Sequence, residues 1–425
     1  MPCQVTQSSS IQHQFNASLT WCSAPATDTA ACVPKVLFVA SASVAKAPLD
    51  GPRKDYRVLA EALDAKVIDV ATVEASALTR LLARIVGVPG AQAVLAFRRR
   101  NEFDAILTDG EHIGLPLALL LKLMRARIPH VTIGHRITAA KKRPFFQLLR
   151  VHSHISRIAL HARAQYDLAV HRLGIASEKL ALVPYQVDTG FWRPAPVPEE
   201  RLICSAGLEW RDYPTLIAAV GDLDARVVIG AASHWSKRRN TAEGVHDQPK
   251  NVTVGAFDYF ALRDLYARSA LVVVPLDETD FQAGITTILE AMAMAKPVIV
   301  THTRGQTDVV EDRRAITRGP QPRSRSKSLL RELAETVGAS VAPSGLYVLP
   351  SDAAALRRAI VYLLGHPEER RRLGAAGRRA VEQFVTVDQY AQRLRQLLEQ
   401  ALEETRSGAT GQPRMRVDTA LQGSH

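Results

Sequence analysis

The 425-residue chain lacks the features that mark several common classes of protein. Its longest apolar run, residues 115–121, ends at Lys122 and is far shorter than the roughly 20 residues of a membrane-spanning helix. No basic segment followed by an apolar one opens the sequence, which argues against secretion. The sequence also contains no Walker loop, no zinc-ligand spacing and no Ser-His-Asp order typical of a hydrolase.

Cysteine is scarce, with four residues in the chain. Cys3, Cys22 and Cys32 lie in a polar N-terminal segment, and Cys204 lies alone in an apolar stretch. These spacings predict neither a disulfide framework nor a metal site, so we expect a reducing, cytoplasmic environment. Residues 1–34 are rich in Ser, Thr, Gln and Ala without periodicity, which predicts a disordered leader.

Acidic residues are too few to balance the basic ones, and the net charge is +12. Residues 35–194 contain 24 Lys and Arg against 13 Asp and Glu, with basic clusters at 98–100 and 141–143. The second cluster runs into an apolar segment, a combination that suits an anionic surface at the inner face of a membrane. A solvated basic surface explains the charge equally well. We expect no nucleic-acid partner, because no known nucleic-acid-binding module accompanies the charge.

The length indicates two domains, and the hydrophobic pattern predicts α/β architecture in both. Short apolar stretches alternate with helical segments in two series, separated by a proline-rich stretch at 185–198. We therefore predict two doubly wound, Rossmann-like domains. The predicted boundaries are a leader at 1–34, a first domain at 35–190, a second domain at 191–385 with a mobile insertion at 313–344, a helix at 386–405 that returns to the first domain, and a flexible tail at 406–425.

The most informative stretch is residues 271–301, in which an apolar strand, a polar loop, a helix and a second apolar strand follow one another. Such a unit places its loop at the carboxyl end of the first strand, where open α/β sheets bind ligands. Gly284 permits a close approach to the backbone, and the amides of Ile285, Thr286 and Thr287 begin a helix, which attracts phosphate. Glu290 follows among apolar residues, where a buried carboxylate needs a partner, so we expect it to bind a ligand.

This block resembles the donor-sugar signature of the family-4 retaining glycosyltransferases. The resemblance implies the GT-B fold, in which two Rossmann-like domains face a cleft. Members of the family carry two acidic residues eight positions apart, and Glu290 matches the second, which binds the ribose hydroxyls of the nucleotide. Gln282 replaces the first acid. An amide can bond sugar hydroxyls, but it carries no charge and is a weaker acceptor.

The resemblance covers most of residues 180–395 and implies a diphosphate-binding role for Arg211. One of the two cations usual in that segment remains. A planar guanidinium can bond two oxygens of a diphosphate and stabilise the charge that develops as the sugar leaves. The alternative is that Arg211 pairs with Glu209 or Asp212 on the surface.

The resemblance also implies roles for four other residues. His135 follows an apolar strand and matches the histidine that contacts the transferred sugar, where a neutral imidazole can both donate and accept. Phe257 lies in the segment that meets the nucleotide base. Ser43 and Glu111 follow strands on the acceptor side. For Glu111 the alternative is a charge at a helix N-terminus.

We predict no metal and no cofactor, with the nucleotide diphosphate sugar acting as donor substrate. The acids at 277, 278 and 280 offer oxygen ligands for a metal, but we expect them to be solvated residues of a loop. The family that the sequence resembles is also metal-independent. The resemblance thus implies a retaining hexosyltransferase with a hydroxyl acceptor. The basic first domain favours a lipid-linked or polyanionic acceptor, and a small hydrophilic or natural-product acceptor is the alternative. The alternatives are an epimerase or phosphorylase of the same fold, and a non-catalytic nucleotide-sugar-binding protein.

Overall fold

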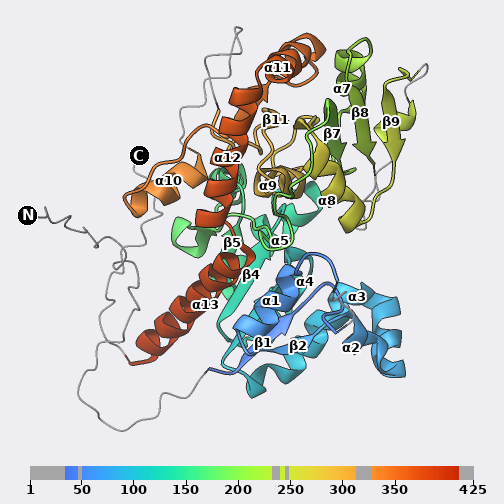
Figure 1. Ribbon diagram of the computed structural model, residues 1–425. Helices are drawn as coiled ribbons and strands as arrows, with labels where there is room; N and C mark the ends of the chain where they lie inside the picture. The colour runs from blue at the N-terminus through green and yellow to red at the C-terminus, as the bar shows by residue number, and fades with distance from the viewer. Residues whose placement is uncertain (1–33, 46–49, 232–239, 245–247, 313–327, 411–425) are drawn as a thin grey trace, which may run out of the picture. The chain divides into compact units, whose positions relative to one another are not determined.

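A computed structural model of the chain describes residues 34–45, 50–231, 240–244, 248–312 and 328–410. The predicted leader (1–34), the insertion (313–344) and the tail (406–425) therefore lie wholly or partly outside the described residues. Two parallel six-stranded sheets with helices on their faces make up the described chain, which confirms the predicted α/β fold class (Figure 1).

The first sheet has the strand order β2-β1-β3-β4-β5-β6. Its strands are β1 (Val36–Val39), β2 (Lys66–Ile68), β3 (Ala105–Thr108), β4 (His130–Gly134), β5 (Arg157–Leu160) and β6 (Leu180–Leu182). Its helices are α1 (Asp55–Ala62), α2 (Val70–Glu74), α3 (Ala77–Arg99), α4 (Glu111–Leu123), α5 (Arg143–Gln147) and α6 (Arg163–Leu173). Short 3-10 turns occur at Arg100–Glu102, Ala140–Lys142, Val151–His154 and Ser177–Lys179.

The second sheet has the order β12-β11-β10-β7-β8-β9. Its strands are β7 (Leu202–Ala206), β8 (Arg226–Gly230), β9 (Val252–Gly255), β10 (Leu271–Val274), β11 (Val298–Thr301) and β12 (Gly345–Val348). Its helices are α7 (Tyr213–Val220), α8 (Tyr259–Arg268), α9 (Ile285–Ala293), α10 (Leu329–Thr336), α11 (Ala353–Gly365) and α12 (Pro367–Phe384), with a 3-10 turn at Thr241–Gly244. The last helix, α13, spans Val387–Thr410.

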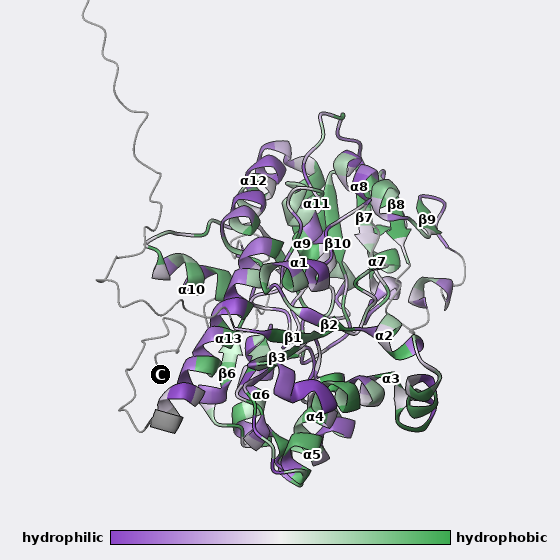
Figure 2. Ribbon diagram, turned by 90° about the horizontal axis from the view of Figure 1, so that it is seen from below, coloured by the Kyte–Doolittle hydropathy of each residue, from purple (hydrophilic) through white to green (hydrophobic). Residues whose placement is uncertain are grey.

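The helices of the first sheet lie on both of its faces, as the alternating side chains of β1 show. Phe38 packs in the same apolar cluster as residues of α1 and α13, whereas its neighbour Leu37 packs with residues of α3 and α4. Right-handed connections give the same result, because the chain reverses direction across the sheet after β2. Figure 2 shows α3, α4, α5 and α6 on the side of the strands opposite α1.

Eleven of the twelve strands consist mainly of apolar residues, as expected for the short apolar stretches that alternate with helical segments in the sequence. The exception is β2, whose three residues Lys66–Ile68 include an exposed lysine and form no apolar run. It is identifiable only through its parallel pairing with β1, where Val39 lies opposite Ile68. A short edge strand needs little buried surface, so hydrophobic pattern alone misses it.

Helix α13 packs against the first sheet although it follows the second sheet in the chain. Tyr390, Leu394 and Leu398 are buried in the same cluster as Phe38 of β1. At the start of the helix, Asp388 accepts two hydrogen bonds from Arg53, at 2.7 and 2.9 Å. The end of the described chain thereby covers the face of the sheet that α1 leaves open.

We predict that replacing Leu394 by Ala destabilises the first sheet. Leu394 is fully buried, and deletion of such a side chain leaves a cavity that costs about 2–5 kcal/mol. Urea unfolding of the full chain measures the loss. Leu123→Ala is the matched control, because Leu123 is 69% exposed and its loss should change stability by less than about 0.5 kcal/mol. Equal effects of the two substitutions would contradict the docking of α13.

Candidate active site

Helix α9 begins directly over a buried arginine. Its N-cap, Gly284, has φ +77°, a conformation that favours glycine, and a Cβ there would lie 3.0 Å from an Nη atom of Arg211. Gly207, after β7, has φ +98°, and its Cβ would lie 2.5 Å from the other Nη atom. The guanidinium therefore fills the space between two loops, both at carboxyl ends of strands.

All three nitrogens of the Arg211 guanidinium donate hydrogen bonds to groups of the protein. Nε donates to the carbonyl of Ala206, Nη1 to the carbonyl of Glu209, and Nη2 to Oγ1 of Thr287. Burial lowers the pKa of Arg211, and no carboxylate of the described residues forms an ion pair with it. The predicted alternative was pairing with Glu209 or Asp212 on the surface. The Arg211 side chain is instead buried, and it donates to the backbone carbonyl of Glu209.

A buried cation that forms no ion pair with the described residues lies beneath a helix N-terminus, and the nearby charges of Glu209 and Glu290 act on it from a distance. The amides of Ile285, Thr286 and Thr287 open α9 above it, and no side chain caps them. Burying a cation without a counter-ion is costly, so the arrangement favours an anionic ligand. The geometry suits phosphate oxygens.

Glu290 lies on the same helix and faces a cavity. Its carboxylate accepts one hydrogen bond, from the Tyr266 hydroxyl at 3.3 Å, and forms no ion pair with the described residues. Burial raises its pKa to about 8, and the bond from Tyr266 and the charges of Lys54 and Arg211 offset this only in part. The site therefore favours the protonated form of this carboxyl more than water does.

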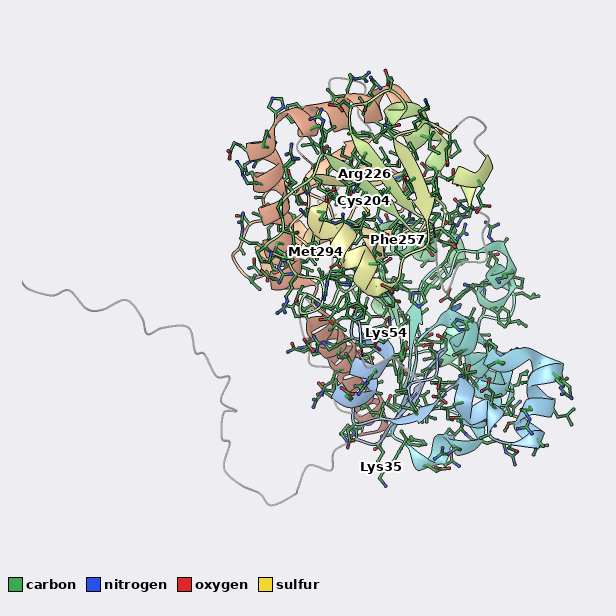
Figure 3. All side chains as sticks on the ribbon, turned by 45° about the vertical axis from the view of Figure 1, so that its right-hand side comes forward. Lys35, Lys54, Cys204, Arg226, Phe257 and Met294 are labelled. Atoms are coloured by element: carbon green, nitrogen blue, oxygen red, sulfur yellow. The ribbon has the colours of Figure 1, made fainter. Side chains whose placement is uncertain are left out.

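The cavity has a volume of about 420 Å³ and is lined from both sheets. Thr286 and Glu290 contribute the wall of the second sheet, together with Tyr259 of α8. Lys54, which is labelled in Figure 3, lies 3.9 Å from the centre of the Tyr259 ring and joins the two walls. The opposite wall comes from loops at the carboxyl edge of the first sheet, with Ser41, Asp55, Asp109 and His135.

Asp109 directly follows β3, and its side chain lines the cavity. Its Oδ2 accepts hydrogen bonds from the amide and the hydroxyl of Ser41, at 2.6 and 2.8 Å. Its Oδ1 is buried and has no hydrogen-bond partner. Burial raises the pKa of Asp109 to about 6 against the effect of these hydrogen bonds. One carboxylate oxygen is thus left for a ligand.

His135 lies at the end of β4 and lines the cavity, as its position in the sequence predicts. Its Nε2 is 3.0 Å from the carbonyl of Asp109, which can only accept, so Nε2 carries a proton. The ring packs 5.4 Å from that of His161, whose pKa is lowered to about 3 by burial. The His135 ring therefore packs against an uncharged imidazole, that of His161.

Glu111, predicted on the acceptor side, does not line the cavity. Its carboxylate is buried and accepts hydrogen bonds from the amides of His135 and Arg136, both at 3.0 Å, and pairs with Lys142. Burial opposes ionisation, but His135 and Lys142 outweigh it and lower the pKa of Glu111 to about 2. This carboxylate holds the end of β4 and thereby orients His135.

Gln282 is buried, and its side-chain amide makes no hydrogen bond of full geometry with the described residues, although it interacts with the carboxylate of Asp308. The side chain lies beside Asp308, whose pKa burial raises to about 6. An unsatisfied buried amide costs about 1–3 kcal/mol, so a ligand hydroxyl that bonded Gln282 would be favoured there. Gln282 is not among the residues that line the 420 Å³ cavity.

The other predicted site residues lie near the carboxyl edges of the two sheets but outside the cavity lining. The Phe257 ring, labelled in Figure 3, packs over Gly230 and Gly255 at the ends of β8 and β9. The Ser43 hydroxyl is buried without a partner. In the loop of acids, Asp280 pairs with Arg136 at 3.2 Å and accepts from Thr138 at 2.8 Å. The described residues contain no cluster of three metal-binding side chains.

The comparison with protein families finds that residues 201–366 match the family described as "Glycosyl transferases group 1". The matched residues run from the start of the second sheet at β7 to the end of α11. No curated protein matches the chain.

Several solved structures share the fold of most of the chain. Sucrose-phosphate synthase from Thermosynechococcus elongatus has a TM-score of 0.63 at 17% identity and covers 87% of this chain and 100% of its own. Anabaena HepE in complex with UDP has a TM-score of 0.60 at 15% identity and covers 86% and 100%. Trehalose 6-phosphate synthase from Burkholderia multivorans has a TM-score of 0.60 at 12% identity and covers 91% and 100%. These likenesses show the GT-B fold.

We predict that Glu290→Gln makes the stability of the ligand-free protein less dependent on pH. The pKa of Glu290 is about 8 in the folded chain and near 4.5 when unfolded, so the folded state binds the extra proton between these values. Stability should therefore fall as pH rises from about 4.5 to about 8, by up to about 1.4 kcal/mol per pH unit. Urea unfolding at pH 5 and pH 8 measures both proteins. Parallel losses in the two would contradict the raised pKa.

Proposed function

We propose that the protein is a retaining glycosyltransferase, which moves a hexosyl group from a nucleotide diphosphate sugar to an acceptor hydroxyl. One observation carries the proposal: helix α9 combines an uncapped N-terminus over the buried Arg211 with a carboxyl, Glu290, that faces the cavity and forms no ion pair with the described residues. The first feature suits a diphosphate and the second suits the hydroxyls of a ribose. The match of residues 201–366 to a glycosyltransferase family supports the same conclusion.

In this proposal the second sheet binds the donor. The amides of residues 284–287 and the charge of Arg211 hold the diphosphate, and Glu290 accepts hydrogen bonds from the ribose. The Gln282 amide bonds a hydroxyl of the transferred sugar. Phe257, over the ends of β8 and β9, contacts the base. No metal is needed to neutralise the diphosphate, because the helix N-terminus and a fixed cation supply positive charge.

The first sheet presents the acceptor from the other wall. His135 contacts the transferred sugar through its ring, and the free oxygen of Asp109 accepts a hydrogen bond from the acceptor hydroxyl. Ser43 lies on the same side and offers an unpartnered hydroxyl. Glu111 acts as a positioning residue, since it holds the amides of His135 and Arg136.

The chemical step follows from this placement. The bond between the anomeric carbon and the phosphate oxygen breaks, and the acceptor oxygen bonds to the same face of that carbon. The acceptor proton passes to the departing phosphate oxygen, so no protein nucleophile is required. Arg211 and the α9 N-terminus stabilise the charge that grows on the diphosphate. Burial of the reacting groups between the two walls keeps out water, which would otherwise hydrolyse the donor.

The first test is nucleotide binding. Two solved neighbours are described as complexes with UDP and with UDP-glucose, so UDP is the first nucleotide to titrate, followed by GDP, ADP and dTDP. We expect one of them to bind by calorimetry, and Glu290→Ala to weaken it at least about 100-fold through loss of the ribose contact. Glu111→Gln is the control, because Glu111 lies outside the cavity lining and should leave nucleotide affinity within a few-fold. Indifference to every nucleotide would remove the transferase proposal.

The second test separates binding from turnover at Gln282. A contact made to the transferred sugar, and not to the nucleotide, should affect kcat more than nucleotide affinity. We expect Gln282→Ala to lower kcat about 10- to 100-fold and to change the Kd of the free nucleotide by less than about threefold. Gln282→Glu restores an acceptor of the same length and should retain more activity. Equal losses in kcat and nucleotide affinity would contradict the assignment.

A further inference from the structure

Exposed apolar side chains are concentrated on one helix layer. Thirteen large apolar residues of the described chain are exposed, and nine of these lie on α3 or at the ends of α4 and α5. These helices cover the same face of the first sheet, opposite α1 and α13 (Figure 2). Scattered exposed apolar residues need no explanation, but a concentration of this kind marks an interaction surface.

The first half of α3 forms the larger patch. Leu78, Leu81 and Ile85 are 67%, 53% and 74% exposed, and Arg80 and Arg84 extend from the same helical turns. The first half of α3 is thus a short helix whose apolar and basic side chains are both in contact with solvent.

The second half of α3 is fixed to the sheet. Gly87, with φ +76°, breaks the helical conformation between the halves. Beyond it Ala93 and Ala96 are buried, and the Gln92 side chain donates to the carbonyl of Ala40 at 2.7 Å. The exposed half is therefore held at the surface by an anchored continuation.

A second patch lies where α4 and α5 end. Leu123 and Met124 are exposed at the end of α4, and Leu148 and Leu149 at the end of α5. The Lys122 ammonium joins these ends by donating to the carbonyl of Leu149 at 2.6 Å. Exposed cations border this patch: Arg125, Arg127, Lys141, Arg143 and Arg150.

The charge of this layer is almost entirely positive. Residues 75–166 contain 15 Lys and Arg and four acids. Two of these acids, Asp109 and Glu111, are held by hydrogen bonds or an ion pair inside the protein. The other two are exposed: Glu102 pairs with Arg99, and Asp104 accepts from the Lys35 amide.

We propose that the outer surface of the α3–α5 layer docks on an anionic lipid bilayer, with the first half of α3 lying in the headgroup region. Apolar side chains bordered by arginines suit that boundary, because the former enter the acyl region and the latter bind the lipid phosphates. The large excess of basic over acidic residues in this layer favours an anionic lipid surface over a protein partner.

The segment Ala77–Glu102 has the length and apolar content of a membrane-spanning helix, by composition alone. Spanning would require the second half of α3 to leave the sheet and would break the bond between Gln92 and Ala40. It would also place Arg80 and Arg84 in hydrocarbon or in a headgroup region remote from the sheet. Surface docking keeps every described contact of this helix.

Co-sedimentation of the full chain with lipid vesicles tests the proposal. We expect binding to vesicles of phosphatidylcholine and phosphatidylglycerol, little binding to phosphatidylcholine alone, and weakening by salt. Arg80→Gln with Arg84→Gln should weaken binding about tenfold or more, because each basic residue near an anionic surface contributes favourably. The readout needs no donor or acceptor, so its outcome is independent of the proposed transferase activity.

A matched pair of substitutions locates the surface. Val86 on α3 and Val361 on α11 are 49% and 47% exposed, so the same change to Glu has comparable effects on folding at both. Val86→Glu should reduce vesicle binding at least about tenfold, and Val361→Glu should leave it unchanged, with thermal unfolding as the check that both fold. Equal binding of both variants, or no binding of the parent to anionic vesicles, would overturn the proposal. Self-association of the parent that Val86→Glu abolishes would assign the surface to a second copy of the chain instead.

Discussion

The site depends on one buried guanidinium. Arg211 ties the loop after β7 to the start of α9, since it bonds the carbonyls of Ala206 and Glu209 on one side and Thr287 on the other. Gly207 and Gly284 lack side chains where a Cβ would strike it. Trp210, in the same loop, adopts φ +54°, a strained value for a bulky residue that the surrounding contacts enforce. The positive end of α9 is thus preorganised before any anion arrives.

The sheets were predictable because parallel strands covered on both faces are continuous apolar runs. The site was predictable in its residues more than in its contacts. Glu290 and His135 follow from their places after a helix start and a strand end. The burial of Arg211 does not, because its partner Thr287 lies 76 residues away. Such a contact is fixed by the sheet order, which brings β7 beside β10.

The sequence could not predict which of two acids after β3 lies in the cavity. Asp109 and Glu111 both follow β3, and sequence position alone favours neither for the cavity. The structure separates them through their partners. Glu111 turns to the amides at the end of β4, and Asp109 turns to Ser41 after β1 and keeps one oxygen free. Pairing of strands that are distant in the chain decides which acid is structural and which can meet a ligand.

The electrostatics of the site also bear on the kind of ligand that fits it. Burial raises the pKa of Glu290, Asp109 and Asp308, and none of the three has a full ion pair to compensate. A metal or an ammonium group is not required to explain them, because hydroxyl donors stabilise the ionised carboxylates through hydrogen bonds. Near them the buried cation of Arg211, which forms no ion pair with the described residues, favours phosphate. Hydroxyl-rich and anionic parts within one molecule satisfy both demands at once, and a nucleotide sugar has this composition.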